Sequence, residues 1–134
     1  VSAAPAAWVP ERREIIWIDH NPQSGKEMKD EHPMLVISPK AFNLKTGIVI
    51  GFPMTSSDGN ADNPFAVAVT TKGKTGYILA HQPKSFDWRE RNARPFTKGQ
   101  VHLGDPKALA QALELLDSIC GICPTSGGLR WQGT

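Results

Sequence analysis

The sequence predicts a mainly β domain, built as a small and strongly curved sheet or barrel that is followed by one amphipathic helix. Short runs of β-branched and aromatic residues recur at close spacing through residues 14–101, which is typical of five to seven strands in such a sheet. Helical spacing of apolar residues begins only after residue 105. A length of 134 residues suits a single domain.

The predicted strands differ in how deeply they are buried. Residues 34–38, MLVIS, are almost wholly apolar, which predicts a strand buried on both faces. Residues 48–55, IVIGFPMT, predict a strand whose Pro53 places its end near an edge or a bulge. Residues 39–47 hold a turn or a single helical turn. The expected strands cover residues 14–19, 34–38, 48–55, 65–70, 76–80, 84–86 and a stretch within 91–101.

The last element is predicted to be an α-helix that begins after Asp105. Asp105 suits an N-cap and Pro106 suits the first helical position, while Gly121 suits the cap at the other end. We expect the apolar stripe of this helix to cover one side or mouth of the barrel. The stripe consists of Leu109, Ala112, Leu113, Leu116, Ile119 and Cys120.

Composition divides the chain into three parts. A loose arm rich in Ala and Pro (1–13) precedes the folded domain (14–122), and a tail rich in Gly and Ser (123–134) should be flexible. The apolar runs are all far shorter than the roughly 20 residues that a membrane-spanning helix needs. The first residues also lack the pattern of a signal peptide. We therefore expect a cytoplasmic protein that does not associate with a membrane.

The basic residues are unevenly distributed, although a net charge of +2 is not diagnostic by itself. Five of them fall between residues 84 and 98, with the aromatic side chains of Trp88 and Phe96 among them. This stretch either follows a nucleic-acid backbone or forms a solvated basic loop. The five are Lys84, Arg89, Arg91, Arg94 and Lys98.

The two cysteines, Cys120 and Cys123, form the motif CGIC at the end of the helical pattern. A structural zinc site generally needs four ligands, and no second Cys or His pair lies at metal spacing. A redox Cys pair normally opens a helix after a strand, which this pair does not. We expect no metal and no cofactor, with Cys120 in the core and Cys123 incidental.

Five segments occur in the order IIWIDHNPQSGKE, HPMLVISPKAFNLKTG, FPMTSS, PFAVAV and AHQPKSFDWRER. Together they resemble the MazF/PemK/Kid family of toxin endoribonucleases from type II toxin–antitoxin systems, over residues 14–122. The resemblance implies an SH3-like barrel with a C-terminal helix, usually as a homodimer. It also implies metal-independent cleavage of single-stranded RNA, which halts translation, and an antitoxin partner whose disordered acidic segment covers the RNA groove.

The resemblance further implies roles for particular residues. Glu27 matches a Glu in the loop after the family's first strand, and Thr55 and Ser56 match a Thr-Ser or Thr-Thr pair that ends its third strand. The residues expected to act in catalysis are His32, Thr55, Glu27 and His81. Those expected to contact RNA are Ser56, Asn43, Gln82, Lys84, Lys26 and Arg89.

Two positions depart from the family pattern. The family relies on an Arg before the proline that opens its second strand, and this chain has His32 there. The family's usual Asp before Gln82 is His81 in this chain. A third position, where some members use an Arg, holds Leu79.

Histidine changes the chemistry that the first of these positions can support. Arginine binds a phosphate through a bidentate fork, which imidazole cannot form. Histidine instead has an ordinary pKa near 6.5, so it can give or accept a proton near neutrality. If His32 and His81 face one groove, they can divide the acid and base roles. Glu27 would then orient an imidazole or act as the base, and Thr55 and Ser56 would bind the scissile phosphate.

Three classes of function remain open on sequence alone. The matches at Glu27, Thr55 and Ser56 favour an active endoribonuclease. The loss of the Arg at position 32 favours a module of the same fold that binds RNA or a protein partner without cleaving. Inhibition of DNA gyrase is the third class, because an SH3-like toxin family with that activity shares the fold and fold alone does not fix function.

Overall fold

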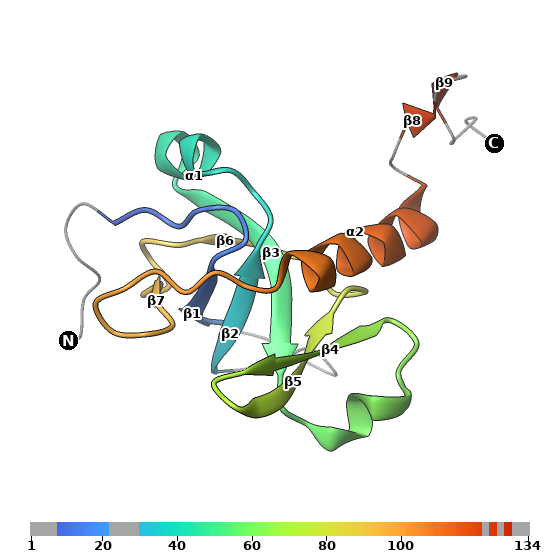
Figure 1. Cartoon of the computed structure of the whole chain (residues 1–134). Helices are drawn as coiled ribbons and strands as arrows, with labels where there is room; N and C mark the ends of the chain where they lie inside the picture. The colour runs from blue at the N-terminus through green and yellow to red at the C-terminus, as the bar shows by residue number, and fades with distance from the viewer. Residues whose placement is uncertain (1–7, 22–29, 122–123, 126–127, 130–134) are drawn as a thin grey trace.

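The computed structural model describes residues 8–21, 30–121, 124–125 and 128–129. A seven-stranded antiparallel sheet has the order β4-β5-β3-β2-β1-β7, with β6 pairing with β3, and α2 packs beside it (Figure 1). The elements are β1 (Ile15–Asp19), β2 (Glu31–Val36), α1 (Lys40–Thr46), β3 (Ile48–Thr55), the 3-10 helix η1 (Asp58–Asp62), β4 (Ala66–Thr71), β5 (Lys74–Leu79), β6 (Lys84–Asp87), β7 (Arg94–Pro95), α2 (Pro106–Cys120), β8 (Pro124–Thr125) and β9 (Gly128–Leu129).

The predicted fold class is confirmed, with one difference in detail. The described part of the chain is mainly β and carries one long helix near its C-terminal end, as expected. The ladder among the described residues does not join β4 to β7, so the sheet is open and not a closed barrel.

Strand β3 lies at the centre of the sheet and pairs with three other strands. One edge pairs with β2, from Val36↔Gly51 to Met34↔Pro53. The other edge pairs with β6 through residues 48–51 and with β5 through residues 54–55. Pro53 therefore falls between the two ladders of that edge, where a missing backbone donor is tolerated. The expectation of an edge or a bulge at Pro53 is wrong: Pro53 lies in a central strand and pairs in register with Met34, at a gap in the other ladder.

Alternation along the strands divides the apolar side chains between two cores. One face contributes Ile15, Leu35, Phe52 and Met54 to a core that α2 covers with Ala108, Ala112 and Leu116. The opposite face contributes Ile16, Ile18, Met34, Val49 and Phe86 to a second core. Trp8 packs against this second core, with its ring 6.0 Å from that of Trp88.

Helix α2 has the predicted ends, but the prediction of its buried face is partly wrong. Asp105 Oδ1 accepts a hydrogen bond from Lys107 N at 3.0 Å, and Gly121 ends the helix with a φ of 62°. Leu113 and Ile119 are 41% and 47% exposed, and Cys120 is exposed rather than in the core. The C-terminal end of α2 projects away from the sheet in Figure 1, so its last turn has no sheet to cover.

The remaining differences concern the ends of elements. Strand β2 begins at Glu31, three residues before the expected start, and the strand expected within 91–101 is only the two-residue β7. The arm is anchored from Trp8 onward, where Trp8 Nε1 donates to Glu14 Oε2 at 3.0 Å. In the tail, β8 and β9 pair with each other. Residues 1–7 and the rest of the segment 122–134 lie outside the described residues.

Candidate functional site

A groove opens at the place where β2 and β3 separate. The β2–β3 ladder ends at Met34↔Pro53. Beyond that pair, Glu31–Pro33 remain with β1, while Met54 and Thr55 turn to pair with β5. The divergence of β3 from β2 therefore leaves a hollow between the end of β3 and the start of β2.

This groove has a volume of about 430 Å³ and brings together several of the predicted site residues. His32, Thr55 and Ser56 line it, from the ends of β2 and β3. The hairpin of β4 and β5 forms another wall, and Trp17 and Phe96 form an aromatic one. The full lining is Ile15, Trp17, Glu31, His32, Pro33, Met54, Thr55, Ser56, Thr71, Lys72, Lys74, Thr75, Gly76 and Phe96.

The tip of the β4–β5 hairpin carries positive charge to the groove. Lys72 and Gly73 have φ values of 51° and 76°, the backbone of a two-residue type I′ turn. This turn joins Thr71 to Lys74, and both lysines line the groove. Lys72 Nζ lies 4.8 Å from the centre of the Phe96 ring.

His32 is half-buried and rests on a second histidine that is fully buried. The rings of His32 and His20 meet edge to face, with centroids 5.7 Å apart. His20 also packs against Phe86 at 5.1 Å. Burial, and to a lesser extent the nearby charges of His32, Lys84 and Arg91, lower the pKa of His20 to about 4. His20 therefore stays neutral at pH 7 and packs as an aromatic ring.

Glu31, at the entrance of the groove, is held by an arginine from β7. Two hydrogen bonds of 2.5 Å join the Arg94 guanidinium to the Glu31 carboxylate in a bidentate pair. These bonds lower the pKa of Glu31 and raise that of Arg94. The negative charge of Glu31 is thus matched inside the protein.

The structure does not bring His81 into this groove. His81 is exposed after β5, where its ring lies 5.8 Å from that of Phe65. Gln82 is half-buried beside it, with the two side chains 3.2 Å apart, and is not part of the groove lining either. The convergence of two imidazoles on one phosphate therefore has geometric support only for His32.

The expectation that Asn43 contacts RNA is contradicted by its burial. Asn43 is 0% exposed in α1, and its amide donates to Pro10 O at 2.8 Å and Ser38 O at 3.1 Å. Its oxygen accepts from Ser38 Oγ at 2.5 Å. All its polar atoms are engaged, so this side chain joins the arm to the domain instead of facing a ligand.

Among the described residues, the other predicted RNA contacts Arg89 and Lys84 are absent from the groove lining. Arg89 is exposed and stacks on Trp88, with its guanidinium 4.6 Å from the ring centre. Arg91 stacks on Phe86 at 4.4 Å and donates to backbone oxygens of Asp19 and Asn21. The basic stretch is thus partly fixed against the domain. Lys84 lies in β6, and Glu27 and Lys26 fall outside the described residues.

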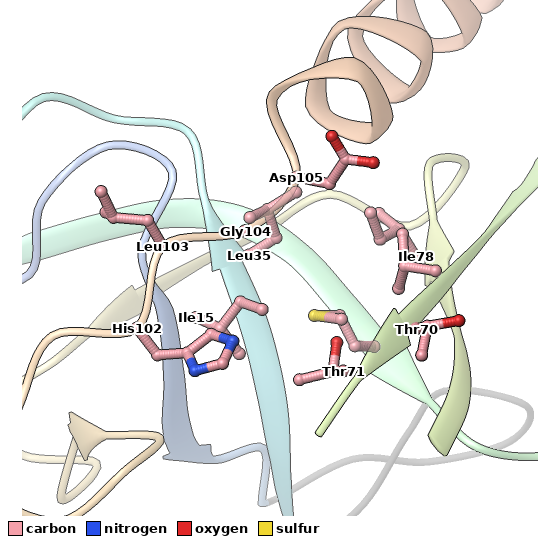
Figure 2. A pocket seen from close by; sticks show the side chains of 11 residues that line it. Ile15, Leu35, Thr70, Thr71, Ile78, His102, Leu103, Gly104 and Asp105 are labelled. Atoms are coloured by element: carbon pink, nitrogen blue, oxygen red, sulfur yellow. The ribbon is translucent and has the colours of Figure 1, made fainter. Parts of the chain in front are cut away.

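A second, smaller hollow lies between the β4 end and the loop before α2 (Figure 2). Its volume is about 60 Å³, enough for a few water molecules but not for a nucleotide. His102, which carried no prediction, lies beside Ile15 on one side of it, and Thr70 and Thr71 lie on the other side.

Two further features of the described residues bear on the class of site. No three His, Cys, Asp or Glu side chains among them are grouped as a metal site requires. No helix in the same part of the chain is long and apolar enough to span a membrane.

The described residues thus form a small open β-sheet with a C-terminal helix, and its groove holds His, Thr, Ser and Lys side chains. The sequence matches the family described as PemK-like, MazF-like toxin of type II toxin-antitoxin system over residues 11–116. This match covers most of the chain, so the chain belongs to that family.

Individual relatives agree with this assignment. The chain is 36% identical over 86 residues to the endoribonuclease toxin MazF of Escherichia coli (strain K12), covering 64% of this chain and 76% of the relative. The crystal structure of MazF from Deinococcus radiodurans superposes with a TM-score of 0.74 at 33% identity, covering 85% of this chain and 98% of that one. A MazE–MazF structure from the same organism gives a TM-score of 0.69 at 29% identity, covering 87% and 99%.

Sequence reasoning assigned no role to Trp17, Phe96 or Lys72, although all three line the groove. Trp17 was visible only as a strand residue and Phe96 as part of a basic stretch. The Lys-Gly pair at residues 72–73 is a signal for a tight hairpin turn, and it locates Lys72 at an exposed tip.

Proposed function

We propose that this chain is an endoribonuclease toxin that cleaves single-stranded RNA without a metal ion. The observation that carries the proposal is the meeting of His32, Thr55 and Ser56 at one groove. The reaction would use the 2′-hydroxyl of the RNA as nucleophile and displace the 5′-oxygen of the next nucleotide. The products are then a 2′,3′-cyclic phosphate and a free 5′-hydroxyl.

In this proposal His32 transfers a proton and the hydroxyls bind phosphate. A positioned acid or base contributes roughly 10²- to 10⁴-fold to such a reaction. Thr55 and Ser56 are half-buried and exposed, so their hydroxyls are reachable donors for the developing charge of the phosphorane. Glu27 remains the candidate for the second proton transfer.

The partners follow from the same assignment. The Deinococcus radiodurans relative has been crystallised as MazE–MazF, and we propose that a cognate antitoxin likewise neutralises this chain. Messenger RNA is the proposed substrate, so we place the activity in the cytoplasm. We also expect a homodimer, whose mass is measurable by light scattering, and exposed apolar residues such as Leu113 and Ile119 are available for contacts.

The decisive experiment incubates pure protein with long single-stranded RNA in excess chelator and maps the new ends. Cyclic phosphates at a repeated short motif are the expected result, and Thr55→Val should reduce the rate at the same sites. Intact RNA that still shifts on a gel would instead establish a binding module, for which the replacement of the family Arg by His32 is the supporting observation. A DNA supercoiling assay tests the gyrase alternative.

A further inference from the structure

We propose that Trp17 and Phe96 form a stacking platform for one unpaired nucleobase of the RNA, next to the reacting phosphate. The inference rests on the proposed function and adds the subsite that positions the substrate. The two rings stack on each other, with centroids 5.3 Å apart and planes inclined by 24°. Both side chains are half-buried, and both line the groove that holds His32 and Thr55.

The platform is fixed in place by the backbone on either side of it. Trp17 lies in β1 and pairs in register with Pro33 of β2 and with Arg94 of β7. Phe96 follows β7 directly, and its backbone N–H donates to Ile15 O at 3.3 Å. Both rings therefore stand on paired strands, and stacking costs little further ordering of the protein on binding.

Charge next to the platform suits a nucleotide better than a neutral ligand. Lys72 lies over Phe96, and Lys74 follows it in the same hairpin. Among the described residues, neither lysine has an ion-pair partner, whereas the one carboxylate in the lining, Glu31, is matched by Arg94. The groove thus keeps positive charge for a phosphate beside aromatic faces for a base, the combination that single-strand binders use.

The volume of the groove also suits a bound nucleotide. A volume of about 430 Å³ falls within the range of sites that enclose one small molecule of nucleotide size. A base on the Trp17–Phe96 platform would lie in the same groove as Lys72, His32 and Thr55. The platform is then a positioning element for the cleavage reaction and a source of preference for the base that it holds.

The test measures binding separately from cleavage. The probe is a short single-stranded RNA with 2′-O-methyl groups throughout, which removes the nucleophile, and with 2-aminopurine placed at each position in turn. The parent protein should quench the fluorescence at one or two positions. Trp17→Leu and Phe96→Leu should abolish that quenching and weaken binding about tenfold or more. Trp17→Phe should restore most of it, and Phe42→Leu, at an exposed ring on α1, should behave as the parent.

Lys72→Asn provides a variant that keeps the fold, because Asn tolerates the left-handed backbone of this exposed turn. It should weaken binding and reduce the slope of log affinity against log salt by about 0.7. Unchanged quenching and affinity in both leucine variants would overturn the platform. Cleavage of unmodified RNA is scored in parallel: an inactive parent with intact quenching would defeat the proposed function and leave the platform standing.

Discussion

The ring of His32 rests edge-on against the ring of His20, which has no exposed surface. Neither nitrogen of His20 has a hydrogen-bond partner among the described residues. His20 therefore acts as a neutral aromatic support beneath the ring of His32. This relationship gives His32 a fixed orientation at the groove, which a proton-transfer group needs.

Replacing His32 should have a much larger effect on RNA cleavage than replacing His81. We expect His32→Ala to lower kcat/KM by roughly 10²- to 10⁴-fold, because it removes a positioned proton-transfer group. His81→Ala should keep most of the activity, since the His81 side chain is outside the groove. Single-turnover cleavage of a labelled RNA measures both. Equal losses in the two variants would restore the paired-histidine mechanism, and two unchanged rates would exclude histidine chemistry.

His20 should make the folded state sensitive to acid. Its pKa is about 4 in the folded protein against an ordinary value of 6.5, so the unfolded state binds the proton more tightly. The stability is complete above pH 6.5 and is lost as the pH falls towards 4, by up to about 3 kcal/mol. His20→Phe keeps the packing against Phe86 and removes this loss. Urea unfolding at several pH values measures it, and parallel curves for parent and variant would contradict the assignment.

Glu14 should make the folded state less stable as the pH rises, which is the opposite of the effect of His20. Burial raises the pKa of this carboxyl from 4.5 to about 7, so the folded state holds its proton more tightly than the unfolded state. Its contribution is fully present below pH 4.5 and is lost as the pH rises through 7. Glu14→Gln gives up one acceptor for Trp8 at every pH. Relative to the parent, its free energy of unfolding should nevertheless improve by up to about 3 kcal/mol between pH 4.5 and about 8.

Asn43 should prove important for folding and unimportant for the chemistry of the folded protein. Asn43→Ala leaves Pro10 O and Ser38 without their buried partners, which should cost about 3 kcal/mol of unfolding free energy. Asn60→Ala, in the 3-10 helix η1, is the matched control and should cost under about 1 kcal/mol. Denaturant unfolding and kcat/KM per folded molecule separate the two roles. A stable Asn43→Ala protein with impaired RNA binding would reinstate the RNA contact.

Gly51 should tolerate no side chain. A Cβ at this position would lie 2.5 Å from Leu35 O and 2.8 Å from Met34 Cγ, so β2 and β3 would have to move apart. We expect Gly51→Ala to destabilise the protein by about 2 kcal/mol or more, which a thermal melt would record as a lowered Tm. Gly59→Ala, where the nearest atom is 3.8 Å away, should melt within a degree or two of the parent.

The parts of the fold that the sequence predicted well are those set by local chemistry. The limits of β3 match the expected 48–55, and the caps at Asp105 and Gly121 match the ends of α2. The start of β2 was missed because Glu31 and His32 are polar and interrupt the apolar pattern, although they pair with Asp19 and Ile18. The exposure of Ile119 and Cys120 depends on where the sheet ends, which helical spacing does not encode.

The candidate site was predictable only in part for a related reason. The family pattern pointed to His32, Thr55 and Ser56, and these do line one groove. Trp17 and Phe96 lie far apart in the sequence, and only the β1–β7 pairing brings their rings together. Asn43 matched the pattern by position, but its burial depends on Pro10 in the distant arm.

The order of the groove's walls along the chain determines when the groove can assemble during synthesis. One wall comes from strands complete by Thr55, but the opposite walls need the hairpin tip at Lys72 and then Phe96. The core beneath them is closed only by α2, which ends at Cys120. A chain still emerging from the ribosome therefore has no assembled groove until translation of the domain is almost finished.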